Sequence, residues 1–165
     1  MNIIKKILNN IEEIIVVPLV GTMATVIILQ VVFRYIVKGS LPWSEELARY
    51  LMVWVTFVGA SIGVKKGAHV GIEAFIMILP KKANTFMKYL GIIISIVFCI
   101  VVLSASIGIL HRQIISHQVS PAMRIPMWWA YGAIPVGTFQ MTIRFIQSLF
   151  KIKAVKAETE NQLWE

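Results

Sequence analysis

The chain has 165 residues, of which 58% are hydrophobic, and a formal net charge of +8. Soluble domains are only about 45–50% apolar, and here the excess lies in long runs, so the composition indicates a membrane protein. The basic residues lie between these runs and form no basic face with interleaved aromatics, which argues against nucleic acid as a partner. A single cysteine, Cys99, rules out an internal disulfide, and the three histidines lack the spacing of metal ligands.

Four stretches are long and apolar enough to form membrane-spanning helices, which need about 20 residues. They cover residues 14–35, 47–64, 86–110 and 127–150. The first follows Lys5 and Lys6, as a signal peptide would, but it is too long for a usual signal core and has no small-residue cleavage motif. We therefore expect a retained helix. The sequence predicts an all-α integral membrane protein with one membrane domain over residues 1–165.

The distribution of basic residues predicts the orientation of these spans. Ten lysines fall on one side of the membrane and five basic residues on the other. Because basic loops are retained in the cytoplasm, the four spans should place both termini there. The ten are Lys5, Lys6, Lys65, Lys66, Lys81, Lys82, Lys88, Lys151, Lys153 and Lys156, and the five are Arg34, Lys38, Arg49, Arg112 and Arg124.

Two shorter segments have the pattern of amphipathic helices lying at the inner surface of the membrane. Residues 2–13 alternate Ile and Leu with Lys, Asn and Glu at helical spacing, and residues 69–80 end at Pro80. The second segment has an alternative interpretation as the extended start of the third span. The polar tail over about residues 154–165 is expected to be disordered.

The spans contain little that could perform chemistry. Their polar residues are mostly Ser and Thr, which can bond to their own helix backbone or across a helix interface. Pro135 predicts a kink in the fourth span, and Arg144 is expected either to reach the headgroups or to pair with a partner chain. The sequence shows no nucleophile with its base and no phosphate-binding loop, so we predict neither an enzyme nor a cofactor or metal site in this chain.

A pair of glycines in the second span is typical of close helix contacts. Gly59 and Gly63 form a G-x-x-x-G motif, which lets two helix backbones approach each other. The motif fits equally well with packing inside the chain and with docking on another protein.

The stretch LPWSEELAR, residues 41–49, places charges at the outer end of the second span. Pro42 suits the first turn of a helix, Ser44 is a candidate cap, and two acidic residues in that turn favour the positive end of the helix dipole. Glu45 and Arg49 can pair at i, i+4 spacing. We expect Arg34, Glu45, Glu46 and Arg49 to form a polar cluster that joins the first two spans and faces a partner.

The same region resembles a known family, the DctQ-like small membrane subunits of tripartite ATP-independent periplasmic (TRAP) transporters. The similarity lies in Arg34 and in the run PWSEELARYLMVWVTFVGASIGVKKGAHVGIE, residues 42–73, which includes Trp43, Gly59 and His69. The WSEELAR entry is most similar to sialic-acid members. Over the last two spans only the hydropathy matches.

The resemblance implies a scaffold rather than a translocator. In this family a separate large subunit is expected to move as an elevator and to hold the substrate and sodium sites, and a periplasmic protein delivers an organic acid such as sialic acid or a C4-dicarboxylate. This chain would brace the large subunit in the bilayer. By the resemblance, contacts with these partners are expected at Arg34, Trp43, Glu45, Glu46, Arg49, Gly59, Gly63 and His69, where His69 has the alternative role of capping the interfacial helix.

Two other functions remain open from the residues alone. One is a standalone proton-coupled drug exporter with four spans, although Glu12 and Glu13 precede the first apolar run and so should lie at the membrane surface. The other is an assembly subunit of a different membrane complex.

Overall fold

The computed structural model describes residues 10–66 and 81–161, and the side chains of residues 10–66 and 86–150. Over these residues the protein is all-helical, apart from an isolated antiparallel β-bridge between Val119 and Pro126. The elements are α2 (Ile11–Val32), the π-helix η1 (Phe33–Val37), α3 (Pro42–Lys65), α5 (Lys81–Ile115), α6 (Trp128–Tyr131) and α7 (Ala133–Asn161).

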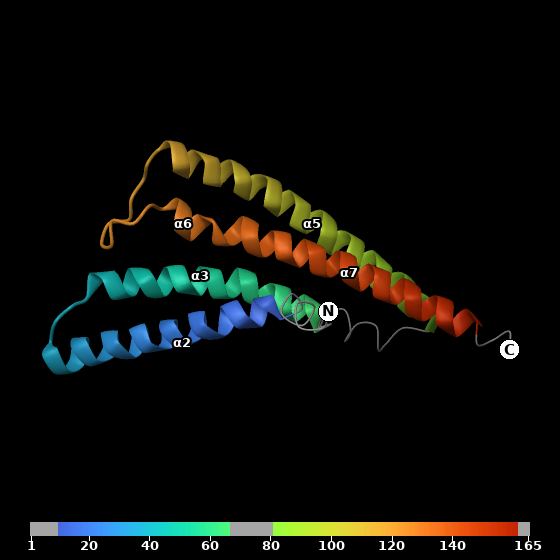
Figure 1. Ribbon diagram of the computed structural model, residues 1–165, viewed down its shortest axis with the longest axis horizontal. Coiled ribbons are helices and arrows are strands. Elements are labelled where there is room, and N and C mark those ends of the chain that lie inside the picture. Colours follow the sequence, from blue (N-terminus) through green and yellow to red (C-terminus); the bar gives the residue numbers. More distant parts are fainter. Residues whose placement is uncertain (1–9, 67–80, 162–165) are drawn as a thin grey trace, which may run out of the picture.

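The helices form a row in the order α2, α3, α7, α5. Helix α3 packs against both α2 and α7, and α5 packs against α7. The α2–α3 connection and the α5–α6 connection lie at the same end of the molecule, which we call the loop end (Figure 1). The start of α2 and the end of α7 lie towards the opposite end, the terminal end.

Within the described residues, three helical stretches have the length and hydropathy needed to cross a membrane. They are Ile11–Val37, Pro42–Lys65 and Phe86–Ile115. On α2 and α5, the outer helices of the row, most of the large apolar side chains are exposed. In a membrane these side chains contact lipid instead of water. The protein is therefore a multi-pass membrane protein. Helix α7 is also long, with 29 residues, but it carries the charge of Arg144 and several amides.

Small residues allow the closest helix contact, between α3 and α7. A Cβ atom added to Gly137 would lie 2.6 Å from the carbonyl carbon of Phe57, so only glycine fits there. Val58 and Thr138 beside this crossing are each 1% exposed, and Ser61 is fully buried. Such packing by small side chains is what holds helices together in a bilayer, because lipid removes most of the hydrophobic driving force between them.

The hydroxyl groups in the spans bond to carbonyls of their own helices, as one of the two sequence interpretations predicted. Thr22 donates to Pro18, Thr25 to Gly21 and Thr56 to Met52, and Ser95, Ser104, Ser106 and Thr138 do the same three or four residues back. These groups therefore need no partner from another helix.

Most helices extend beyond the predicted limits of their spans. Helix α3 begins at Pro42, which lies in its first turn as predicted, but Ser44 does not cap it, because its hydroxyl donates to the carbonyl of Leu41. The fourth stretch is broken at Gly132, between α6 and α7, since Pro135 has no N–H to offer the carbonyl of Tyr131 four residues earlier.

At its other end, α7 continues to Asn161, through part of the tail that was expected to be disordered. The residues from Lys151 to Asn161 include several Lys, Ala and Glu and neither Gly nor Pro, so their helix propensity favours continuation. The predicted amphipathic segments fall mostly outside the described residues, residues 69–80 entirely and residues 2–13 up to residue 9.

Candidate functional site

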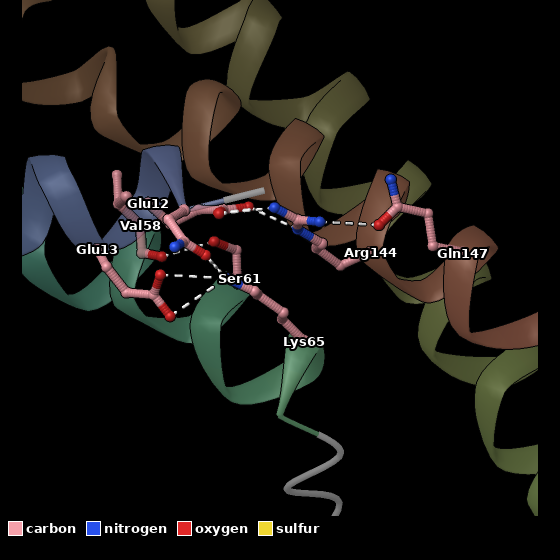
Figure 2. A network of polar contacts seen from close by, with 8 residues as sticks. Glu12, Glu13, Val58, Ser61, Lys65, Arg144 and Gln147 are labelled. Carbon is pink, nitrogen blue, oxygen red and sulfur yellow. Dashed lines mark hydrogen bonds and ion pairs between the residues drawn. The ribbon is translucent and has the colours of Figure 1, made fainter. Parts of the chain in front are cut away.

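A buried ion pair joins the first and last helices at the terminal end. Arg144 Nε lies 2.6 Å from Glu12 Oε1, and Arg144 Nη2 lies 2.7 Å from Glu12 Oε2, so the carboxylate is held by two parallel bonds (Figure 2). The side chains are only 8% and 3% exposed. Arg144 Nη1 also donates to Gln147 Oε1 at 2.9 Å. Two-pronged pairing of this kind offsets the cost of burying both charges.

A second polar contact lies beside the first and joins α2 to α3. The Lys65 ammonium donates to both oxygens of Glu13, at 3.2 and 3.1 Å, and to Asn10 Oδ1 at 2.9 Å. These side chains are partly exposed, at 17% for Lys65 and 31% for Glu13. Glu12 and Glu13 thus point to different neighbours, α7 and α3, from adjacent positions at the start of α2 (Figure 2).

At the loop end, Glu46 fixes the connection between α5 and α6. One carboxylate oxygen accepts hydrogen bonds from the backbone N–H groups of Ala122 and Met123, at 2.9 and 3.0 Å, and the other accepts one from the Tyr50 hydroxyl. Glu46 is 8% exposed. We call this contact the Glu46 latch, because it ties the start of α3 to a turn 76 residues later in the chain.

The four charges at the loop end do not form the single cluster that the sequence predicted. Arg49 and Glu45 do pair, at 3.2 Å, but both side chains are about two-thirds exposed (68% and 66%). Glu46 turns away from them to the latch. Arg34 lines a small polar pocket together with Glu45, and within the described residues it forms no ion pair. The local i, i+4 pair was thus predictable, whereas the partners of Glu46 depend on the tertiary fold.

The remaining predicted contact residues lie apart from that cluster. Trp43 is 41% exposed at the start of α3. A Cβ atom added to Gly59 or Gly63 would meet nothing within 4 Å, so the G-x-x-x-G motif serves no packing among the described residues. His69 falls outside them.

The residues that the sequence analysis missed are the partners at the terminal end. Glu12 and Glu13 were expected at the membrane surface, and Arg144 at the headgroups or on a partner chain. A signal was present, because four alternating spans bring the start of the first, the end of the second and the end of the fourth to one side. Opposite charges at those three places, Glu12 or Glu13 with Lys65 or Arg144, therefore come close together.

The arrangement offers contacts rather than chemistry. Across the part of the chain that the structure describes, no three His, Cys, Asp or Glu side chains gather as metal ligands would. The buried carboxylates are engaged by Arg144 and by backbone N–H groups. Their geometry supports structural roles that hold two helical hairpins together.

Comparison with known proteins identifies a family. The family model for the DctQ component of tripartite ATP-independent periplasmic transporters matches residues 23–153. The sialic acid TRAP transporter small permease protein SiaQ of Vibrio cholerae is 32% identical over 155 residues, which cover 92% of this chain and 87% of that protein.

Two further relatives differ in length from this chain. The C4-dicarboxylate TRAP transporter small permease protein DctQ of Rhodobacter capsulatus is 33% identical over 111 residues, and the match covers 67% of this chain and about half (49%) of that protein. The sialic acid TRAP transporter permease protein SiaT of Haemophilus influenzae is 32% identical over 147 residues, 87% of this chain but only 23% of its own length.

We predict that neutralising either partner of the buried pair will destabilise the protein. Glu12→Gln or Arg144→Gln removes the two-pronged ion pair and leaves the opposite charge buried, which should cost about 3–5 kcal/mol. The double variant should lose less than the sum of the single losses. Thermal unfolding in detergent measures this, with Glu45→Gln as the matched control, because an exposed pair contributes only about 0–1 kcal/mol. Equal losses for Arg144→Gln and Glu45→Gln would contradict the assignment.

We also predict that Glu46→Gln will loosen the α5–α6 connection. The amide keeps the size of the side chain and can place its carbonyl oxygen on both backbone N–H groups, but it carries no charge, so these two hydrogen bonds should weaken. Hydrogen exchange followed by mass spectrometry should show faster exchange of peptides containing Ala122 and Met123. Glu45→Gln, one residue away, is the control and should leave that exchange unchanged. Unaltered exchange in Glu46→Gln would rule the latch out.

Proposed function

This chain belongs to the DctQ family, the small membrane components of TRAP transporters, and we propose that it is the scaffold subunit that braces a large, elevator-type subunit during sodium-driven uptake of an organic acid. In this all-helical membrane protein, buried polar contacts hold the two hairpins together at both ends, and the family consists of transporter components. This observation carries the proposal. A static brace needs such internal contacts, whereas a translocator needs a substrate site. The family membership also places the chain among transport proteins rather than enzymes.

The proposed topology has four spans, with α6 and α7 together forming the fourth and both termini in the cytoplasm of a bacterial cell. Two observations support it. The lysines concentrate on one side of the spans. Both interhelical connections named above lie at the loop end, and the start of α2 and the end of α7 lie towards the other (Figure 1). The loop end would then face the periplasm, and the whole chain would form one membrane domain of the inner membrane.

The proposed partners are a large TRAP membrane subunit and a periplasmic substrate-binding protein. The relative SiaT, a sialic acid TRAP transporter permease protein that this chain matches over 23% of its length, supports the first. The substrate class follows from the names of relatives, which include sialic acid and C4-dicarboxylate transporters. Sodium coupling and substrate binding are assigned to the large subunit, and no cofactor is assigned to this chain.

We place the contact with the large subunit on the open face of α3. Met52, Thr56 and Ala60 are exposed at spacings of four residues, and Gly59 and Gly63 lie beside them with no neighbour that a Cβ would meet. The Thr56 hydroxyl is already satisfied by Met52, so a partner helix need supply no hydrogen bond. A face of small residues lets a second backbone approach closely.

At the loop end, the exposed Arg34, Trp43, Glu45 and Arg49 remain available to partner proteins, whereas Glu46 is occupied by its latch.

Reconstitution tests the proposed function. In liposomes with an inward sodium gradient, the large subunit, this chain and the binding protein together should accumulate sialic acid or a C4-dicarboxylate. This chain alone should transport neither, because the proposal assigns substrate binding to the large subunit. The measurement is uptake of radiolabelled substrate, with the large subunit and binding protein alone as the comparison. Full uptake without this chain, or transport by this chain alone, would overturn the proposal.

Glycine substitutions test the proposed contact face. Gly59→Leu with Gly63→Leu should reduce co-purification of the large subunit by about tenfold or more, because two bulky side chains keep the backbones apart. Thermal unfolding of the isolated chain should be unchanged, since a Cβ at either position meets nothing.

Gly21→Leu with Gly108→Leu is the matched control for this test, because these glycines are equally open but lie on α2 and α5. Gly137→Ala provides the opposite control and should destabilise the chain itself, as a Cβ there clashes with Phe57. If both Leu pairs co-purify with the large subunit equally well, the contact lies elsewhere.

A further inference from the structure

The two helical hairpins leave a wedge-shaped cavity between them at the loop end. Its volume is about 640 Å³. The hairpins touch tightly where Gly137 meets Phe57, and the Glu46 latch joins them again closer to the loops. One wall comes from the first three turns of α3, and the other from the end of the α5–α6 connection, α6 and the start of α7. The residues that line it include Glu45, Arg49, Val53, Met127 and Ile134.

The wedge is apolar in its depth and polar at its rim. Both α3 and α7 run from the loop end into the membrane, so Val53 and Ile134 lie deeper than Ser40 and Glu45. Glu45 and Val53 are eight residues apart, which corresponds to about 12 Å along a helix. A cavity with apolar walls is a poor host for water, because water there lacks hydrogen-bond partners. In a bilayer, the acyl chains of neighbouring lipids are the apolar groups that can fill such a cavity.

The rim supplies charges that match a phospholipid headgroup. Arg49 uses one amino group, Nη2, for its 3.2 Å bond to Glu45, and its side chain is 68% exposed. A guanidinium group has five N–H donors in a planar fork, a geometry that suits the oxygens of a phosphate. Glu45 next to it is an acceptor for the ammonium group of a zwitterionic headgroup.

The loop end as a whole has an excess of positive charge. Glu46 is engaged by backbone N–H groups, which leaves Glu45 as the one exposed acid among the described residues here, against five basic residues. These are Arg34, Lys38, Arg49, Arg112 and Arg124. This excess of positive charge favours a ligand with an anionic group, such as a phosphodiester, over a cationic ligand.

We propose that the wedge binds one phospholipid, with its phosphodiester on Arg49 and an acyl chain between Val53, Met127 and Ile134. Free phosphate would use the rim alone and leave the apolar walls uncovered. The lipid fills the gap between the hairpins and completes the packing that the latch and the Gly137 crossing begin. The cavity lies nearer the loop end of α3 than Gly59 and Gly63 do.

Lipid titration of the purified, delipidated full chain tests this site. Native mass spectrometry should show one phosphatidylethanolamine bound with an affinity at least tenfold higher than that of diacylglycerol with the same chains. Arg49→Gln should weaken phosphatidylethanolamine binding about tenfold, and Val53→Trp, which fills the wedge, should weaken it similarly. Lys38→Gln is the charge-matched control, because Lys38 lies at the same end but does not line the wedge.

Several results would overturn the proposal. These are equal binding of diacylglycerol, equal effects of Arg49→Gln and Lys38→Gln, and full competition by inorganic phosphate. In native membranes, phosphatidylethanolamine with a photoreactive acyl chain should cross-link to peptides spanning Met127 to Ile134, and Val53→Trp should reduce that yield. Cross-links confined to the exposed faces of α2 and α5 would show only surrounding bilayer lipid. A protein cross-link in place of the lipid at the wedge would assign the space to a partner.

Discussion

Hydrocarbon offers no hydrogen-bond partners, so every polar group that this chain carries into the membrane must be satisfied within it. The hydroxyls meet this constraint most simply, on the carbonyl one turn back. The charges cannot do so, and they bring distant segments together instead. Glu12 with Arg144 at one end and Glu46 with the peptide groups of the α5–α6 connection at the other are the contacts that place the two hairpins relative to each other.

The spans could be predicted because transfer of a helix into lipid depends mainly on its own residues, read locally along the chain. For the same reason the Glu45–Arg49 pair was predictable from its i, i+4 spacing. The buried pair was not, because its members are 132 residues apart and meet only after four helices pack in a row. Likewise Glu46 was grouped with its sequence neighbours, although its partners belong to a loop on the other hairpin.

The glycines show what a motif can and cannot specify. The G-x-x-x-G spacing indicates a helix face that allows close approach, but it does not say which helix approaches. Inside the chain the close crossing is made by Gly137, a single glycine with no such spacing. A Cβ atom at Gly59 or Gly63 would meet nothing within 4 Å, which is why the proposed function assigns this face to another chain.

The pairing of the first helix with the last also has a consequence for synthesis. A ribosome releases Glu12 long before Arg144, so for most of translation the acid at the start of α2 has no counter-charge. The neutralising residue arrives only with the final helix. A chain that stops early, or whose last helix fails to insert, therefore keeps an uncompensated carboxylate next to the bilayer. The buried position of Glu12 is therefore completed only by a residue that is synthesised 132 positions later.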